Sequence, residues 1–275
     1  MTQAQLLSRF RQLSRLQAKQ EAAWGPVMEK ALSDQIKPVL AYLRDHSIPE
    51  TIALTGSLIR PDVLRPPLQA LYRRAGVEAA NSEYGFLVQQ FPEILQRKSF
   101  GLNEFFRGLM QAFFDSFATR KITQMTFTSQ QWINFRLQWA LDNGYDTINA
   151  AKLIVSTGSN VNKYRSRLIA RTELLGAASY GNKIGAQKTG LAMEKVWISA
   201  QHWNTRRLPE DKFDHYHAHM SKVGMDEKFL ILSKTGGEYL DFPGDPAGSA
   251  GNICNCLCKA IHQPIRDASG RLVTA

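Results

Sequence analysis

The amino-acid sequence predicts an α+β fold, in which a mostly helical N-terminal region precedes a small domain with a short, largely antiparallel sheet. Apolar residues recur at three- and four-residue spacing over much of the chain before residue 190, a period typical of amphipathic helices. After Gly190 the period becomes two, and short apolar runs alternate with turns that contain glycine or proline, as expected of strands. We therefore expect a helical region over 1–159, an α+β domain over 160–262 and a C-terminal tail over 263–275.

The composition is that of a globular protein with a sizeable core. The 275 residues are 44% hydrophobic and 21% charged, which is a normal balance for folded domains. No segment approaches the ~18 uninterrupted apolar residues of a membrane helix, and the N-terminus lacks the apolar core of a secretory signal. We expect no association with a membrane.

The net charge of +10 favours a polyanionic partner, either DNA or an acidic protein surface. Residues 1–20 contain four cations and no acid. In a helix three of them recur at every fourth position, and Leu6, Phe10 and Leu13 form an apolar stripe on the opposite side. This segment fits two interpretations. In the first it is a surface that binds DNA phosphates or an acidic partner, and in the second it is the solvated face of a bundle helix. The cations are Arg9, Arg11, Arg15 and Lys19.

The helices before residue 160 are expected to be short to medium in length, because proline and glycine interrupt the helical pattern repeatedly. The clearest helix follows Gly101, with Asn103 as its cap. The threonine-rich segment 122–128 is ambiguous between a strand and an extended stretch. Ser129 is expected to cap a further helix that ends near Gly144, and a short helix over 147–155 should stop at 157–159. The other expected breaks are Pro38, Pro49, Gly56, Pro61, Pro66, Pro67 and Gly76.

The helix that contains Arg171 is predicted to pack on the sheet. On a helical wheel Arg171 and Asn182 share a stripe with small and apolar residues, which indicates a core-facing side. A guanidinium in such a place needs a carboxylate or several carbonyl groups, because an unpaired buried charge is very costly. Glu173 cannot serve from position i+2, so Asp226 or Glu227 is the expected partner. The alternative is that Arg171 clamps a substrate or cofactor.

Four strands are expected after residue 190. Alternation predicts the first over 196–199. The second and third are expected over 228–232 and 239–242, with Gly236-Gly237 as the turn before the third. The fourth is expected over 256–261.

An ordered set of residues in the last third of the chain resembles the Mu-F-like domain of tailed bacteriophages, the minor head or head-morphogenesis family. The set begins with an Ala-Arg-Thr-Glu segment at 170–173 and ends with Asn-Cys-Leu-Cys at 255–258, so the resemblance covers roughly residues 160–260. The whole set in this order is far less expected by chance than any one of its members. Its residues are Arg171, Thr172, Glu173, Asn182, Trp197, Arg206, His217, Glu227, Phe229, Pro243, Gly244, Asp245, Pro246, Asn255, Cys256 and Cys258.

The resemblance implies a structural protein of the phage head. It implies location at the portal vertex of the virion, with the host cytoplasm as the place of assembly. It also implies a low copy number and a role in head assembly or in the packaging or delivery of DNA. The expected partners are the portal protein and other head proteins, with packaged double-stranded DNA as a further candidate.

A cluster of histidines and thiols raises the question of a metal. The three cysteines are too close in sequence to form a disulfide framework, and we expect reduced thiols. Relatives that resemble a zinc module carry Cys-x-x-Cys before the second strand and His-Pro-x-Cys-x-Cys at the end. This chain has no upstream cysteine and has Ile253-Cys254 in place of His-Pro, so we expect no cofactor and a metal-free, hydrogen-bonded loop. In the alternative, zinc binds among His215, His217, His219, Cys254, Cys256 and Cys258.

No catalytic motif is present, and we do not expect an enzyme. The sequence lacks Gly-x-Ser-x-Gly, a Gly-Lys-Ser/Thr phosphate loop and His-Glu-x-x-His. One alternative is a nuclease or other metal-dependent hydrolase that uses the histidines with Glu227 or Asp245. A second alternative is an ADP-ribosyltransferase-like trio of Arg171, Ser199 and Glu227.

Overall fold

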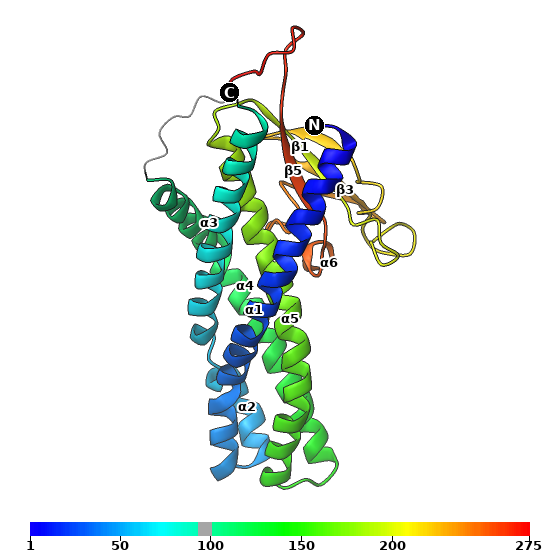
Figure 1. The fold of residues 1–275 in the computed structure, drawn as a ribbon. Helices are drawn as coiled ribbons and strands as arrows, with labels where there is room; N and C mark the ends of the chain where they lie inside the picture. Colours follow the sequence, from blue (N-terminus) through cyan, green and yellow to red (C-terminus); the bar gives the residue numbers. More distant parts are fainter. Residues whose placement is uncertain (93–100) are drawn as a thin grey trace. The chain divides into compact units, whose positions relative to one another are not determined.

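The computed structural model describes residues 1–92 and 101–275, and it confirms the α+β class (Figure 1). Long helices precede two small antiparallel sheets. No described helix combines the length and the apolar character needed to cross a bilayer. The helices are α1 Gln3–Asp45, α2 Ile48–Leu58, the 3-10 helix η1 Asp62–Leu64, α3 Arg65–Gln90, α4 Leu102–Asp142, α5 Thr147–Gln187 and α6 Ala250–Ile253. The strands are β1 Met193–Ile198, β2 Lys222–Gly224, β3 Phe229–Ser233, β4 Gly236–Leu240 and β5 Lys259–Pro264.

The helices are longer than predicted. Helix α1 continues through Pro26 and Pro38 over 43 residues, although a proline inside a helix costs about 3 kcal/mol. Ile36 and Val39, which lie close to Pro38 in the helix, are buried in a core. This burial outweighs the hydrogen bond that the proline cannot make. Gly76 is no break either, because a Cβ atom there would lie 2.1 Å from Met110. Gly76 lies inside α3 and allows Met110 of α4 to pack closely against that helix.

The predicted strand or extended stretch at 122–128 and the cap at Ser129 are wrong, because both lie inside α4. Thr128 donates its hydroxyl to the Gln124 carbonyl one turn earlier, at 3.0 Å, which lets threonine fit a helix. Ser129 donates to Gln35 Oε1 at 2.8 Å. Asn103 was expected to cap this helix, but it lies within the first turn of α4, where it accepts from Asn81 Nδ2 at 2.8 Å.

The predicted stop at 157–159 is also wrong, since α5 runs on to Gln187. Thr157 donates to the Leu153 carbonyl at 2.6 Å, and Ile154 and Asn162 are buried on either side of the segment. A single glycine costs a helix only about 1 kcal/mol. The end of α4 near Gly144 and the start of α2 at Pro49 agree with the sequence, and a capping box between Ser47 and Glu50 precedes α2.

The chain forms two compact units, each built from separated segments. The first unit contains 1–21, 71–113 and 171–275, and the second contains 22–70 and 114–170. The boundary expected at 159/160 falls inside α5, and the domain division by sequence stays a prediction. The second unit is helical. Its core joins α1, α2, α4 and α5 through Ile36, Val39, Leu43, Ile48, Ile59, Ile133, Leu137, Ala140, Ala150 and Ile154.

The first unit contains both sheets, and every strand pair is antiparallel. The three-stranded sheet has the order β2-β1-β5, with Val196 opposite Ile261 and Lys222. Strands β3 and β4 form a hairpin in which Ser233 pairs with Gly236. The turn is therefore at 234–235, before the predicted Gly236-Gly237. The sequence indicated the other four strands but not β2, which has only three residues.

The N-terminal apolar stripe is covered within this unit. Leu6 and Leu13 are buried, and with Phe10 they pack against Val196, Ile198 and Ile261 of the sheet. The stripe therefore needs no partner molecule. Of the four cations, Arg11, Arg15 and Lys19 are exposed.

Arg9 is a structural residue, in contrast to the partner-binding role predicted for it. It is 3% exposed and pairs with Glu83 of α3 at 2.6 Å. The other carboxylate oxygen of Glu83 lies 3.0 Å from His262 Nδ1 on β5. Burial raises the pKa of Glu83, but hydrogen bonds and charges from His262 and Arg9 outweigh it, so the net pKa is lowered. The triad joins α1, α3 and β5.

We predict that Glu83→Ala lowers the free energy of unfolding by about 3–5 kcal/mol, because it leaves the Arg9 guanidinium buried without its counter-charge. Urea unfolding at neutral pH measures the loss. The control is Asp62→Ala, which breaks the exposed pair between Arg60 and Asp62 and should have little effect. Similar losses in the two variants would contradict a structural role for the triad.

The triad also predicts a pH dependence. The folded-state pKa of Glu83 lies below its usual value of 4.5, so its contribution to stability is present above that value and is lost as the pH falls below it. The difference in unfolding free energy between the wild type and Glu83→Gln should therefore shrink as the pH falls through the acidic range. A difference that is constant down to acid unfolding would rule this linkage out.

Candidate functional site

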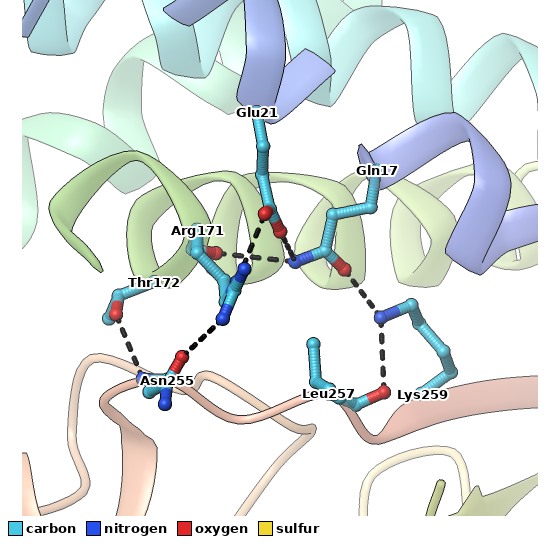
Figure 2. Close-up of polar contacts among 7 residues, drawn as sticks. All are labelled: Gln17, Glu21, Arg171, Thr172, Asn255, Leu257 and Lys259. Carbon is cyan, nitrogen blue, oxygen red and sulfur yellow. Dashed lines mark hydrogen bonds and ion pairs between the residues drawn. The ribbon is translucent and has the colours of Figure 1, made fainter. Parts of the chain in front are cut away.

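Two neighbouring residues of α5 hold the start of the Asn-Cys-Leu-Cys segment (Figure 2). Arg171 Nη1 donates to Asn255 Oδ1 at 2.6 Å, and the Asn255 amide donates to Thr172 Oγ1 at 3.1 Å. Asn255 has a positive φ of 57°, a conformation that asparagine tolerates better than most residues. The first and last segments of the ordered set that resembles the Mu-F-like domain, which we call the family-like set, thus meet at one place in the first unit.

The acid that pairs with Arg171 is Glu21, not Asp226 or Glu227. Glu21 Oε2 accepts from Arg171 Nε at 3.0 Å (Figure 2). No local pattern indicated this pair, because 150 positions separate the two residues. Glu227 instead accepts from the Gly224 amide at 2.8 Å. The Arg171 side chain is 34% exposed, so it lies at the edge of the core that was predicted to bury it.

A chain of polar contacts continues from Glu21 to β5. Gln17 donates to Glu21 Oε1 at 3.0 Å and to the Arg171 carbonyl at 3.4 Å. Lys259 Nζ in turn donates to Gln17 Oε1 at 2.5 Å and to the Leu257 carbonyl at 3.3 Å (Figure 2). Burial lowers the pKa of Lys259 to about 8. The segment from Asn255 to Lys259 is therefore tied to both α1 and α5.

The two buried thiols of this segment face one histidine. His215 Nδ1 lies 3.4 Å from Cys256 Sγ and 3.6 Å from Cys258 Sγ. The three donor atoms all lie within 4.8 Å of one another. We call His215, Cys256 and Cys258 the thiol–histidine cluster. The indole of Trp197 packs edge-on against the His215 ring, with 5.6 Å between centroids.

Two polar residues set the orientation of the His215 ring. Glu238 Oε2 lies 3.0 Å from Asn252 Nδ2, and a carboxylate can only accept there, so the amide nitrogen of Asn252 must face it. Asn252 Oδ1 then lies 2.7 Å from His215 Nε2 and accepts a hydrogen bond from the Nε2–H group. This relay leaves His215 Nδ1 directed at the sulfur atoms.

The thiols differ in their protonation. Hydrogen bonding from Cys258, together with the nearby His215, holds the pKa of Cys256 well below its usual value despite burial. Burial and the neighbouring Cys256 sulfur raise the pKa of Cys258 well above its usual value. The pair therefore favours a thiolate at Cys256 and a thiol at Cys258. Such a pair can act as a soft ligand set.

The other candidate metal ligands lie elsewhere. The His217 side chain is 68% exposed and contacts Asp214 at 2.8 Å. His219 Nδ1 accepts from the Ser199 amide at 3.2 Å. The Cys254 carbonyl accepts from Arg206 Nη2 at 2.5 Å, and its sulfur is outside the cluster.

Several other residues of the set pack or hydrogen-bond in the structure around this segment. Trp197 and Phe229 pack in the core between the sheets, 5.3 Å apart. Tyr72 donates to Glu173 Oε2 at 2.8 Å. Asp245 accepts from the Asp241 amide at 2.9 Å and so closes the Pro-Gly-Asp-Pro turn over 243–246. Gly244, with a φ of 83°, brings this turn against α5, where a Cβ would lie 3.0 Å from the Gly176 nitrogen.

The residues considered for catalysis each have separate contacts. Arg171 pairs with Glu21 and Asn255, Ser199 Oγ accepts from Gln201 at 2.6 Å, and Glu227 contacts Gly224. None of these contacts joins one member of the Arg171, Ser199 and Glu227 trio to another.

Lys195 and Asp241 were missed in the sequence. Lys195 on β1 is fully buried and donates to the Glu227 carbonyl at 2.7 Å, the Asp241 carbonyl at 3.0 Å and the Asp241 carboxylate. Lys183 contacts the same carboxylate at 2.6 Å. A lysine next to Val196 has the pattern of an outward-facing strand residue, so no local signal indicated its burial. Asn252 and Glu238 were also missed, because their roles depend on His215.

Comparisons of the chain with family models, with curated proteins and with solved structures found no match.

We predict that Arg171→Ala lowers the free energy of unfolding by about 1.5–3 kcal/mol, the usual range for hydrogen bonds to a charged group. Glu21→Ala should produce part of the same loss, and the two changes should be non-additive because they remove one interaction. Arg15→Ala, an exposed change on α1, serves as the control. If Glu227→Ala coupled to Arg171→Ala and Glu21→Ala did not, the assignment of Glu21 would be wrong.

Proposed function

We propose that the protein is a minor head protein of a tailed phage or prophage, associated with the portal vertex and active in head assembly and in the packaging or delivery of DNA. The observation that carries this proposal is the ordered family-like set, whose two ends meet in the contact of Arg171 and Thr172 with Asn255. Trp197 also packs against Phe229. Some members of the set therefore contact one another, which supports the resemblance over a chance series of common residues.

The contacts of the candidate catalytic residues support a structural role for these side chains. Glu227 and Asp245 bind backbone amides of turns, and Arg171 holds the C-terminal segment. These side chains stabilise the fold, so we assign no catalysis to them. The proposed location is the virion head, with assembly in the host cytoplasm.

The exposed cations Arg11, Arg15 and Lys19 are the proposed contact to the portal. Their spacing of four residues places them along one side of α1, while the apolar side of the helix is covered by the sheet. The surface offered to a partner is therefore charged, and it fits an acidic protein surface through steering and complementarity. The same chemistry also fits DNA phosphates, which makes DNA binding the second candidate function.

The test is co-purification of the full chain with the portal ring encoded in the same genome. We predict that the wild type is retained and that the triple change of Arg11, Arg15 and Lys19 to Gln abolishes retention, because it removes the complementary charge. The matched control neutralises Arg73, Arg74 and Lys228, three other exposed cations, and should retain the ring.

DNA binding is measured in parallel as a function of salt. If the cations contact phosphates, the triple change should flatten the logarithmic salt slope by up to about 2.7 units, ~0.9 for each phosphate that is no longer neutralised. Loss of salt-sensitive DNA binding with intact portal retention would overturn the portal contact. Failure of the wild type to bind the portal at all would contradict the proposed function.

A further inference from the structure

The thiol–histidine cluster has the donor set and spacing of a metal site. Zinc binds thiolate at about 2.3 Å and imidazole at about 2.0–2.1 Å, so a tetrahedral ion holds a nitrogen and a sulfur donor about 3.5 Å apart. The distances from His215 Nδ1 to the two sulfur atoms are 3.4 and 3.6 Å. All three side chains are buried, and solvent therefore competes little for the donors.

The relay behind His215 matches the requirement of a metal-bound imidazole. A ligating histidine presents a deprotonated ring nitrogen to the ion and donates its other N–H to a fixed acceptor. Asn252 provides that acceptor at 2.7 Å, and Glu238 fixes Asn252 at 3.0 Å. Three elements of the fold thus aim one lone pair of His215 at two thiols.

Two cations lie near the cluster. Lys259 follows the second thiol directly and interacts electrostatically with both Cys256 and Cys258. Arg206 is close enough to contribute to the electrostatics of His215. Two thiolates, one neutral imidazole and a divalent cation carry no net charge together, which reduces the cost of burial.

We propose that His215, Cys256 and Cys258 bind one zinc ion, which joins the 201–221 loop to the C-terminal segment. The described residues supply three ligands, and a water molecule or another small ligand completes the tetrahedron. The ligand set is not a sequence motif, because His215 precedes Cys256 by 41 positions. The missing upstream cysteines led us to expect no zinc, but His215 provides a ligand in their place. The role is structural, and it is independent of portal binding.

The experiment is metal analysis of the full chain, purified under reducing conditions without a metal-affinity tag or chelator. Mass spectrometry of the elements should find about one zinc per chain. Exchange with Co(II) should give the sulfur-to-cobalt charge-transfer absorption and the intense visible bands of a tetrahedral thiolate site. Absence of zinc, together with absence of these bands after Co(II) is added to the reduced wild type, would overturn the proposal. This test needs no variant.

Variants identify the ligands. Cys256→Ser and His215→Ala should each lose most of the bound zinc and of the Co(II) spectrum, with circular dichroism as the check on folding. The matched controls are Cys254→Ser and His217→Ala, a thiol and a histidine from the same segments that lie outside the cluster. They should keep both signals. Equal metal loss in the controls would show that the assigned ligand set is wrong.

Discussion

The hydrogen bonds of Asn255 to Arg171 and Thr172 fix the path of the C-terminal segment, and much of the first unit depends on that path. With Asn255 in place, Cys256 and Cys258 lie close to His215. Lys259 reaches Gln17 (Figure 2). Strand β5 follows at once and pairs with β1 along its whole length. A shift of one residue here would move every side chain of β5 to the opposite face of the sheet.

The same unit buries several charged groups, and each has a specific partner. Glu83 serves both Arg9 and His262, and Asp241 serves both Lys195 and Lys183. Buried ion pairs add little net stability compared with apolar packing, but breaking one is costly. Their effect is therefore to penalise alternative arrangements of the elements that they join. In this chain these elements are α1, α3, α5 and the strands.

The sequence was sufficient for the fold class, four of the five strands that the described residues form and the antiparallel pairing, because these follow from the change of period after Gly190. It was insufficient for helix lengths, since Gly76 and Pro38 have the local pattern of breaks and only tertiary packing shows that the helix continues. The partners of Arg171 and Arg9 lie far away along the chain, and periodicity contains no information about them. The thiols were visible as candidates, but the choice of His215 over His217 and His219 depends on the fold of the loop.

Hydrogen exchange at the Asn255 amide tests most directly whether α5 clamps this residue. The amide donates to Thr172 Oγ1 at 3.1 Å, so in the native wild type it should exchange far more slowly than an unstructured amide. Thr172→Val removes the acceptor and keeps the side-chain volume, and exchange at Asn255 should then accelerate selectively. Rapid exchange in the wild type, or protection that is unchanged in Thr172→Val, would contradict the clamp.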